Sequence, residues 1–162
     1  MSLYDWLLFL HVTGAFFLIG GVTIAGILNL IAIAPDRRPS QVATLYRLIR
    51  FAVPLIGIGM LLTLAIGLWL VHESPWNYGY GDTWVVVALV LWALAGGLGG
   101  IDGRYQRATG ELAERLAAEG DAPSSELRGR LRNARALAIS YGSGLAAFAV
   151  LGIMIWKPGA GP

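Results

Sequence analysis

Four long stretches of this chain contain no Asp, Glu, Lys or Arg, and they constrain the fold more than any other feature. They run from Trp6 to Pro35, Phe51 to Val71, Thr83 to Ile101 and Ala136 to Trp156. A helix rises about 1.5 Å per residue, so about 20 apolar residues cross the ~30 Å hydrocarbon core of a bilayer. We therefore predict four membrane-spanning helices, at about 6–34, 51–71, 83–101 and 136–156.

The same stretches argue against a membrane β-barrel. Barrel strands alternate apolar and polar residues over about ten positions, whereas these stretches are continuous. Within lipid, a helix satisfies all the backbone hydrogen bonds of such a segment. Only 14% of the residues are charged, against roughly 25% in soluble domains. We predict an all-α polytopic membrane protein, a four-helix bundle forming one transmembrane domain over residues 1–162.

The distribution of basic residues predicts the orientation of the bundle. All eleven arginines lie in the connection between the first two spans or in the one between the last two, and Lys157 is the remaining basic residue. The positive-inside rule assigns arginine-rich connections to the cytoplasm. We therefore expect both termini outside, in the inner (plasma) membrane of a bacterial cell. The first span lacks a basic leading region, so we expect an uncleaved helix rather than a signal peptide.

The polar segment 102–135 between the third and fourth spans is predicted to form a cytoplasmic helical hairpin. Gly120 and Pro123 interrupt its helical pattern, and Ser124 or Ser125 can cap the helix that follows. Four leucines are candidates for the hairpin seam: Leu112, Leu116, Leu127 and Leu131. Arginines beside a span are typical of a topology signal, so we expect no nucleic-acid partner.

Two further details concern residues at the ends of these spans. Ser40 is the expected N-cap of a helix over 41–50 in the first cytoplasmic connection. Asp102 follows the third span directly, where capping or solvation is the expected role. Both expectations place a polar side chain at a helix end.

Small residues indicate how the helices pack. Lipid supplies no hydrophobic drive between helices, so close approach through glycine and alanine stabilises a bundle. The third span contains Gly96 and Gly100, and also Gly99 and Gly103, at GxxxG spacing. The partners we expect are the lipid bilayer and, through such glycine-rich faces, a larger membrane complex or a second copy.

His11 is the residue inside a span that most suggests chemistry. It lies about five residues from the outer end of the first span, hence ~8 Å deep. At 100° per residue, Asn29 returns to the same helix face. A neutral imidazole can ligate haem iron or copper, and it can equally hydrogen-bond a neighbouring helix.

His72, the second histidine, stands at the outer end of the second span. Because both histidines occupy the outer half of the bundle, His11 and His72 are the candidate haem ligands, with Asn29 on the same face as His11. They are also the candidate copper ligands. The chain has no cysteine and only three scattered methionines, and soft-metal sites usually use more sulfur donors.

Several motifs resemble one bacterial family. They are the opening 5–15 (DWLLFLHVTGA), followed by Gly20 and Gly21, the segment 67–72 (GLWLVH), the loop 78–82 (YGYGD) and the end 156–159 (WKPG). Together they resemble the four-helix membrane proteins of domain of unknown function 2269, across nearly the whole chain. This resemblance implies topology and no activity.

More distantly, the Leu-His opening with its Gly-Gly pair is similar to copper-resistance D proteins and to the bacterial protoporphyrinogen oxidase HemJ. In the latter, the resemblance implies a first-span histidine associated with haem b, and His11 is the matching position. An intramembrane lysine of that oxidase has no counterpart, because Lys157 is the only lysine and lies outside the spans. The resemblance therefore supports haem binding more than it supports the oxidation of protoporphyrinogen.

The sequence predicts a multi-pass protein without catalysis of its own, an accessory or scaffolding subunit of a larger membrane assembly. It contains no phosphate-binding loop, no His-Glu-x-x-His motif and no paired intramembrane carboxylates. The alternative is a haem-b-binding membrane redox protein that uses His11. A further alternative is a copper transport or tolerance protein.

Overall fold

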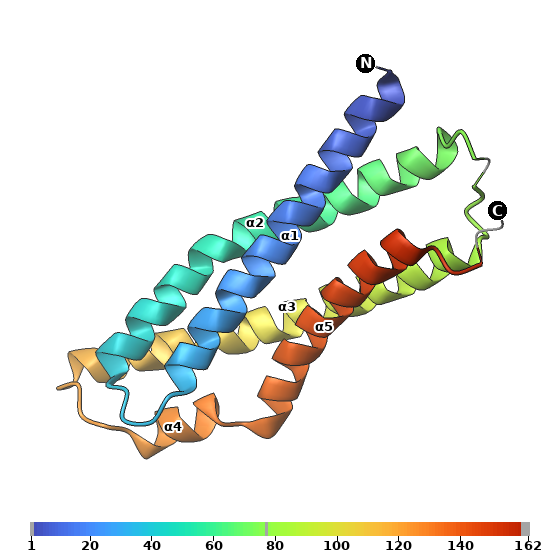
Figure 1. Ribbon diagram of the computed structural model, residues 1–162. Coiled ribbons are helices and arrows are strands. Elements are labelled where there is room, and N and C mark those ends of the chain that lie inside the picture. Colours follow the sequence, from blue (N-terminus) through green and yellow to red (C-terminus); the bar gives the residue numbers. More distant parts are fainter. Residues whose placement is uncertain (1, 77, 160–162) are drawn as a thin grey trace.

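The computed structural model describes residues 2–76 and 78–159, and its regular structure is helical (Figure 1). Five helices follow one another: α1 Leu3–Ile33, α2 Pro39–His72, α3 Thr83–Ala118, α4 Ser125–Leu131 and α5 Ala134–Trp156. No strand occurs within the described ranges. Four helical stretches are long and apolar enough to cross a membrane, the last consisting of α4 and α5 together. The predicted all-α, four-span fold is confirmed.

Local signals explain where the helices begin. The Ser2 hydroxyl accepts a hydrogen bond from the Asp5 N–H and the Asp5 carboxylate accepts one from the Ser2 N–H, a capping box that starts α1. Ser124 accepts from the N–H of Leu127, as predicted, and so caps α4. The Asn133 side chain caps α5 by accepting hydrogen bonds from the N–H groups of Arg135 and Ala136.

The start of α2 differs from the prediction. The helix begins at Pro39, so Ser40 lies inside its first turn and does not act as the N-cap. The Asp121 carboxylate, from the turn between α3 and α4, instead accepts from the Ser40 N–H and hydroxyl, each at 2.7 Å. Proline suits a first helical position because its missing N–H has no helical partner there. A residue distant in sequence therefore provides the cap that the local pattern suggested for Ser40.

The helices form two close pairs. α1 packs along α2 and α3 packs along α5, whereas α2 touches α3 less and α1 touches α5 less again (Figure 1). Glycines make the α1–α2 seam narrow: a Cβ at Gly21 would stand 2.7 Å from Ile56 Cγ1, and one at Gly59 would collide with the Leu18 backbone nitrogen. This is the close approach that small residues permit in lipid.

The main buried cluster lies at the arginine-rich end. Leu112, Leu127 and Leu131, three of the four predicted seam leucines, belong to it, and Leu116 packs against it. The cluster also includes Val42 and Tyr46 of α2. The leucines therefore join α3 and α4 to the α1–α2 pair as well as to each other.

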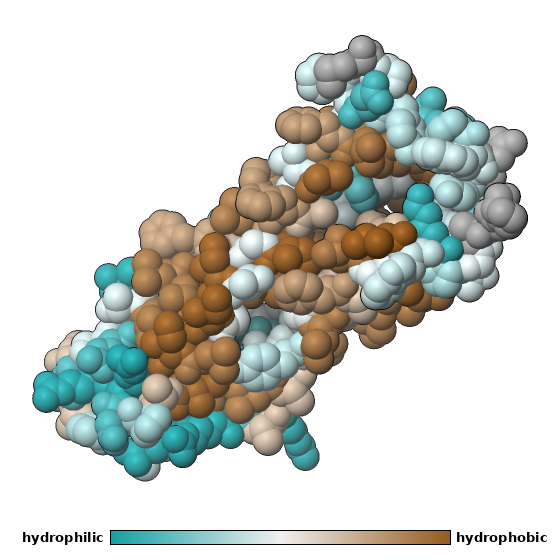
Figure 2. Space-filling model, in the orientation of Figure 1, coloured by the Kyte–Doolittle hydropathy of each residue, from teal (hydrophilic) through white to brown (hydrophobic). Residues whose placement is uncertain are grey.

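The outer surface suits lipid. Large apolar side chains are exposed on all four long helices, among them Phe16 (74%), Phe51 (73%) and Leu145 (71%). Figure 2 shows hydrophobic residues over the middle of the bundle and hydrophilic residues gathered at its two ends. Burying such a band in a bilayer removes its apolar surface from water.

Candidate functional site

The His11 imidazole lies between three helices in the half of the bundle away from the arginine-rich end. Gly67 of α2 makes room for it, since a Cβ there would stand 2.8 Å from His11 Cε1. His11 Nε2 is 3.4 Å from the thioether sulfur of Met154 on α5. His11 Nδ1 is buried and has no hydrogen-bond partner in the described part of the chain. Nε2 therefore contacts a sulfur atom that could also ligate a soft metal ion, and Nδ1 has no hydrogen-bond partner among the described residues.

His72 is not brought to His11. It is the last residue of α2 and is exposed. It follows Gly67, the glycine against His11, by five residues, which places it ~7.5 Å further along α2 and ~140° around it. The two histidines therefore do not face one another across a shared site.

Asn29 shares the face of His11 but occupies a different place. Its side-chain oxygen accepts a hydrogen bond from the Tyr46 hydroxyl at 3.0 Å, and both groups are buried. Eighteen residues of helix separate Asn29 from His11, a distance of ~27 Å along the axis. Both residues face α2, as one stripe predicts, yet Asn29 joins helices rather than the His11 environment.

The cavity beside His11 is small. It is lined by Gly67 and Met154 with Thr63, Trp84 and other mostly apolar neighbours, and it measures about 40 Å³. Cofactor pockets measure roughly 300–1,000 Å³, so a porphyrin does not fit here in this arrangement. Among the described residues, no three or more His, Cys, Asp or Glu side chains converge as a metal site.

Other polar side chains inside the helices connect one helix to another. The Asp102 carboxylate accepts from the Ser140 hydroxyl of α5 at 3.0 Å and from the Gln106 amide at 2.6 Å. Asp102 lies within α3 rather than at its end, so the expected capping role is wrong. The Trp92 indole of α3 donates to the Met60 carbonyl of α2 at 3.3 Å.

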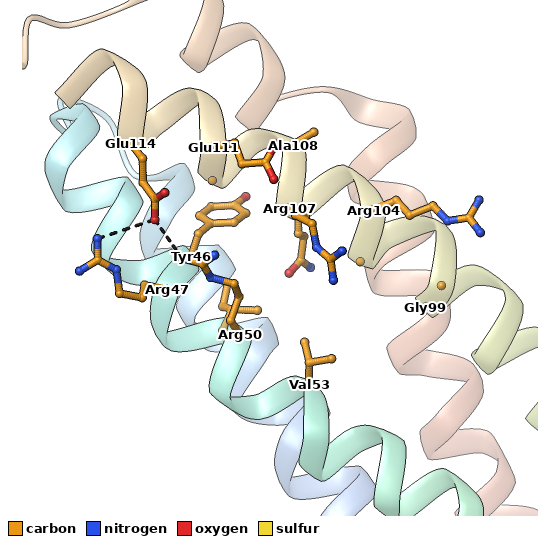
Figure 3. Close-up of a pocket in the computed structure, with 15 residues that line it drawn as sticks. Tyr46, Arg47, Arg50, Val53, Gly99, Arg104, Arg107, Ala108, Glu111 and Glu114 are labelled. Carbon is orange, nitrogen blue, oxygen red and sulfur yellow. Dashed lines mark hydrogen bonds and ion pairs between the residues drawn. The ribbon is translucent and has the colours of Figure 1, made fainter. Parts of the chain in front are cut away.

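A second, larger cavity opens between α2 and α3 at the arginine-rich end. It measures about 490 Å³ and is lined by four arginines, two glutamates and several glycines: Arg47, Arg50, Arg104, Arg107, Glu111, Glu114, Gly99, Gly100, Gly103 and Gly110, with Tyr46, Ile49, Val53, Gln106 and Ala108. Glu114 pairs with Arg50 at 2.9 Å and with Arg47 at 3.7 Å. Arg107 extends into the space between the helices, with Val53 lying below it (Figure 3).

Sequence reasoning missed this cavity, although a signal was present. The arginines lie three residues apart on each helix, just outside a charge-free stretch: 47 and 50 before the second, 104 and 107 after the third. Residues at this spacing share a helix face. That the two faces meet depends on how α2 packs against α3, which spacing alone does not determine.

Comparison with known proteins gives one match. A family model described as "Predicted integral membrane protein (DUF2269)" covers residues 5–158. No curated protein matches the chain, and no solved structure matches it. The distant similarities to copper-resistance D proteins and HemJ therefore stay predictions.

Proposed function

Because the chain belongs to the DUF2269 family of integral membrane proteins, we propose that it is a non-catalytic accessory or scaffolding subunit of a larger assembly in the bacterial inner membrane. One observation carries this proposal: the polar side chains within the bundle hold helices together. Asn29 bonds Tyr46, Asp102 bonds Ser140, and Trp92 bonds the Met60 carbonyl. Side chains used in this way stabilise a scaffold and offer little to a substrate.

The partner contact we propose lies on α3. A Cβ added at Gly97 would meet no atom within 4 Å, and Ala93, one turn earlier, is exposed. A face of such small residues lets a helix approach closely within lipid. We assign it to a helix of another membrane subunit.

A photo-crosslinking amino acid at position 97 tests this assignment in native membranes. We expect one discrete adduct with a different membrane protein, and none from the same probe at Leu145, which is exposed on α5. An adduct of twice the chain's mass would indicate a second copy and contradict the assembly proposed. Failure of both probes to form an adduct would also overturn it.

The orientation proposed has both termini outside, because the arginine-rich connections favour the cytoplasm. Alkaline phosphatase fused to either end should be active, and a green fluorescent protein fused to either end and exported unfolded should be dark. Fluorescence from a C-terminal fusion would contradict this orientation.

The second function rests on the His11–Met154 pair. An imidazole nitrogen beside a thioether is a soft donor set that suits monovalent copper, and histidine with methionine is also a known haem axial set. The 40 Å³ cavity that Met154 lines is too small for a porphyrin, whereas an ion would bind at the imidazole nitrogen and the sulfur, which lie 3.4 Å apart. The geometry therefore supports a copper transport or tolerance role better than a haem-b redox role.

One preparation separates these functions. Protein purified in detergent from haem-sufficient, copper-supplemented cells is measured for absorbance and for copper content. The scaffold proposal expects neither a Soret band nor stoichiometric copper. Copper lost in both His11→Ala and Met154→Leu, but kept in His72→Ala, would replace the scaffold with the copper function. A Soret band lost in His11→Ala would establish the haem function.

A further inference from the structure

The cavity between α2 and α3 is charged at one end and apolar at the other. Its charged residues lie outside the charge-free stretches, whereas Val53, Gly99 and Gly100 lie within them. It therefore straddles the level at which a bilayer changes from headgroups to hydrocarbon. Basic pockets between membrane helices at this level bind anionic lipid headgroups.

One wall of the cavity consists of glycines of α3. They are Gly99, Gly100 and Gly103, and a Cβ at any of them would meet no atom within 4 Å. No side chain of the described bundle fills this space, and its volume of about 490 Å³ is within the range of small-molecule sites. An acyl chain can therefore lie against α3 below the charged rim.

The charge of the rim favours an anion. Four arginines and two glutamates line the cavity, and Glu114 is already shared between Arg47 and Arg50. Neither Arg104 nor Arg107 forms an ion pair with any described residue. A guanidinium presents two parallel N–H groups that match the oxygens of a phosphate.

We propose that this cavity binds the phosphate headgroup of an anionic phospholipid, with Arg107 as its main contact, Arg50 supporting it, and an acyl chain along the α3 glycines. This proposal requires only that the protein resides in a membrane, so it stands apart from the scaffold function. Glu111, on the rim, weakens binding by like-charge repulsion.

Native mass spectrometry of the full chain in detergent tests the site, with phosphatidylglycerol or phosphatidylcholine added at equal concentration. The wild type should retain one phosphatidylglycerol in preference to phosphatidylcholine. Arg107→Gln should weaken this preference about fivefold, as expected for one basic side chain near anionic lipid. Glu111→Gln should strengthen it, a gain that misfolding does not produce.

Arg135→Gln is the matched control, because Arg135 flanks the fourth span outside the cavity and carries the same charge. It should retain the wild-type preference. Equal losses in Arg135→Gln and Arg107→Gln would indicate unspecific surface attraction and overturn the proposal, as would a wild type without preference. Displacement of the lipid by millimolar glycerol phosphate would show that the site takes a soluble phosphate instead.

Discussion

Glycines serve opposite purposes in the α1–α2 seam and on α3. In the seam, Gly21 and Gly59 lie against backbone and side-chain atoms of the opposing helix, so any side chain there would push the helices apart. On α3, Gly97, Gly99 and Gly100 face open space. The same residue type thus closes one interface and leaves another face uncovered. Glycine spacing alone therefore indicates that another helix could pack closely there, but it does not indicate that one does.

The sharpest test of this difference is an alanine at each kind of glycine. Gly59→Ala should destabilise the fold by about 3 kcal/mol, near the top of the range for overpacking, because its neighbours are backbone atoms that cannot rotate away. Gly97→Ala should be neutral or stabilising by up to ~1 kcal/mol, since alanine is the better helix former. Unfolding by SDS titration in mixed micelles, followed by circular dichroism, measures both. Equal losses would contradict the contrast.

A second test compares hydrogen bonds in the two regions. Tyr46→Phe leaves the buried Asn29 oxygen without its donor in the α1–α2 seam, and we expect a loss of about 1 kcal/mol. Trp92→Phe removes a donor to the Met60 carbonyl between α2 and α3, which already accepts a helical hydrogen bond. Its cost should be smaller, at most ~0.5 kcal/mol. The same titration checks the order, and a larger loss for Trp92→Phe would reverse it.

A cation stabilises the end of the looser α2–α3 region that lies away from the arginines. Lys157, after α5, places its ammonium 4.7 Å from the Tyr78 ring centre, 5.5 Å from Trp84 and 5.7 Å from Trp76. Lys157→Gln should cost about 0.5–1 kcal/mol through lost cation–π attraction. Lys157→Arg should keep most of it, and tryptophan emission should shift only in the glutamine variant. An unchanged spectrum in both variants would contradict the cation–π contact between Lys157 and these rings.

The smallest expected effect concerns the opposite end. Two hydrogen bonds from Ser40, and secondarily the charge of Arg38, hold the pKa of the Asp121 carboxyl below its ordinary value of 3.8. Because the folded pKa is lowered, this contribution to stability is complete above pH 3.8 and is lost as pH falls through the lower folded value. The stability difference between wild type and Asp121→Asn should therefore be constant near neutral pH and shrink below pH 3.8. A difference that grows on acidification would show the opposite linkage.

Much of the fold could be predicted from the lengths of the four charge-free stretches. Four long apolar stretches locate the spans because lipid leaves the backbone no alternative to a helix. The helix ends were less predictable, because charged residues stop a membrane span without stopping a helix: α2 begins at Pro39 and α3 continues to Ala118. This is why Asp102, expected at an end, lies inside α3 and bonds α5.

The sites were harder to predict for a different reason. The stripe on α1 correctly placed His11 and Asn29 on one face, but the two residues lie ~27 Å apart along the helix axis. The neighbours that matter come from other helices, Met154 beside His11 and Arg107 across from Arg50. Sequence periodicity gives each helix a face; which faces meet depends on packing across the bundle.

One residue of α2 has a mechanical consequence. Pro54 lies inside the helix, and because it carries no N–H, the carbonyl of Arg50 one turn earlier lacks its usual donor. The helix is consequently most compliant beside the arginine that lines the larger cavity. Bending at Pro54 would widen or narrow the mouth of the cavity. The segment of α2 before Pro54, which carries Arg50, would then move relative to the glycine-packed segment around Gly59, which stays fixed against α1.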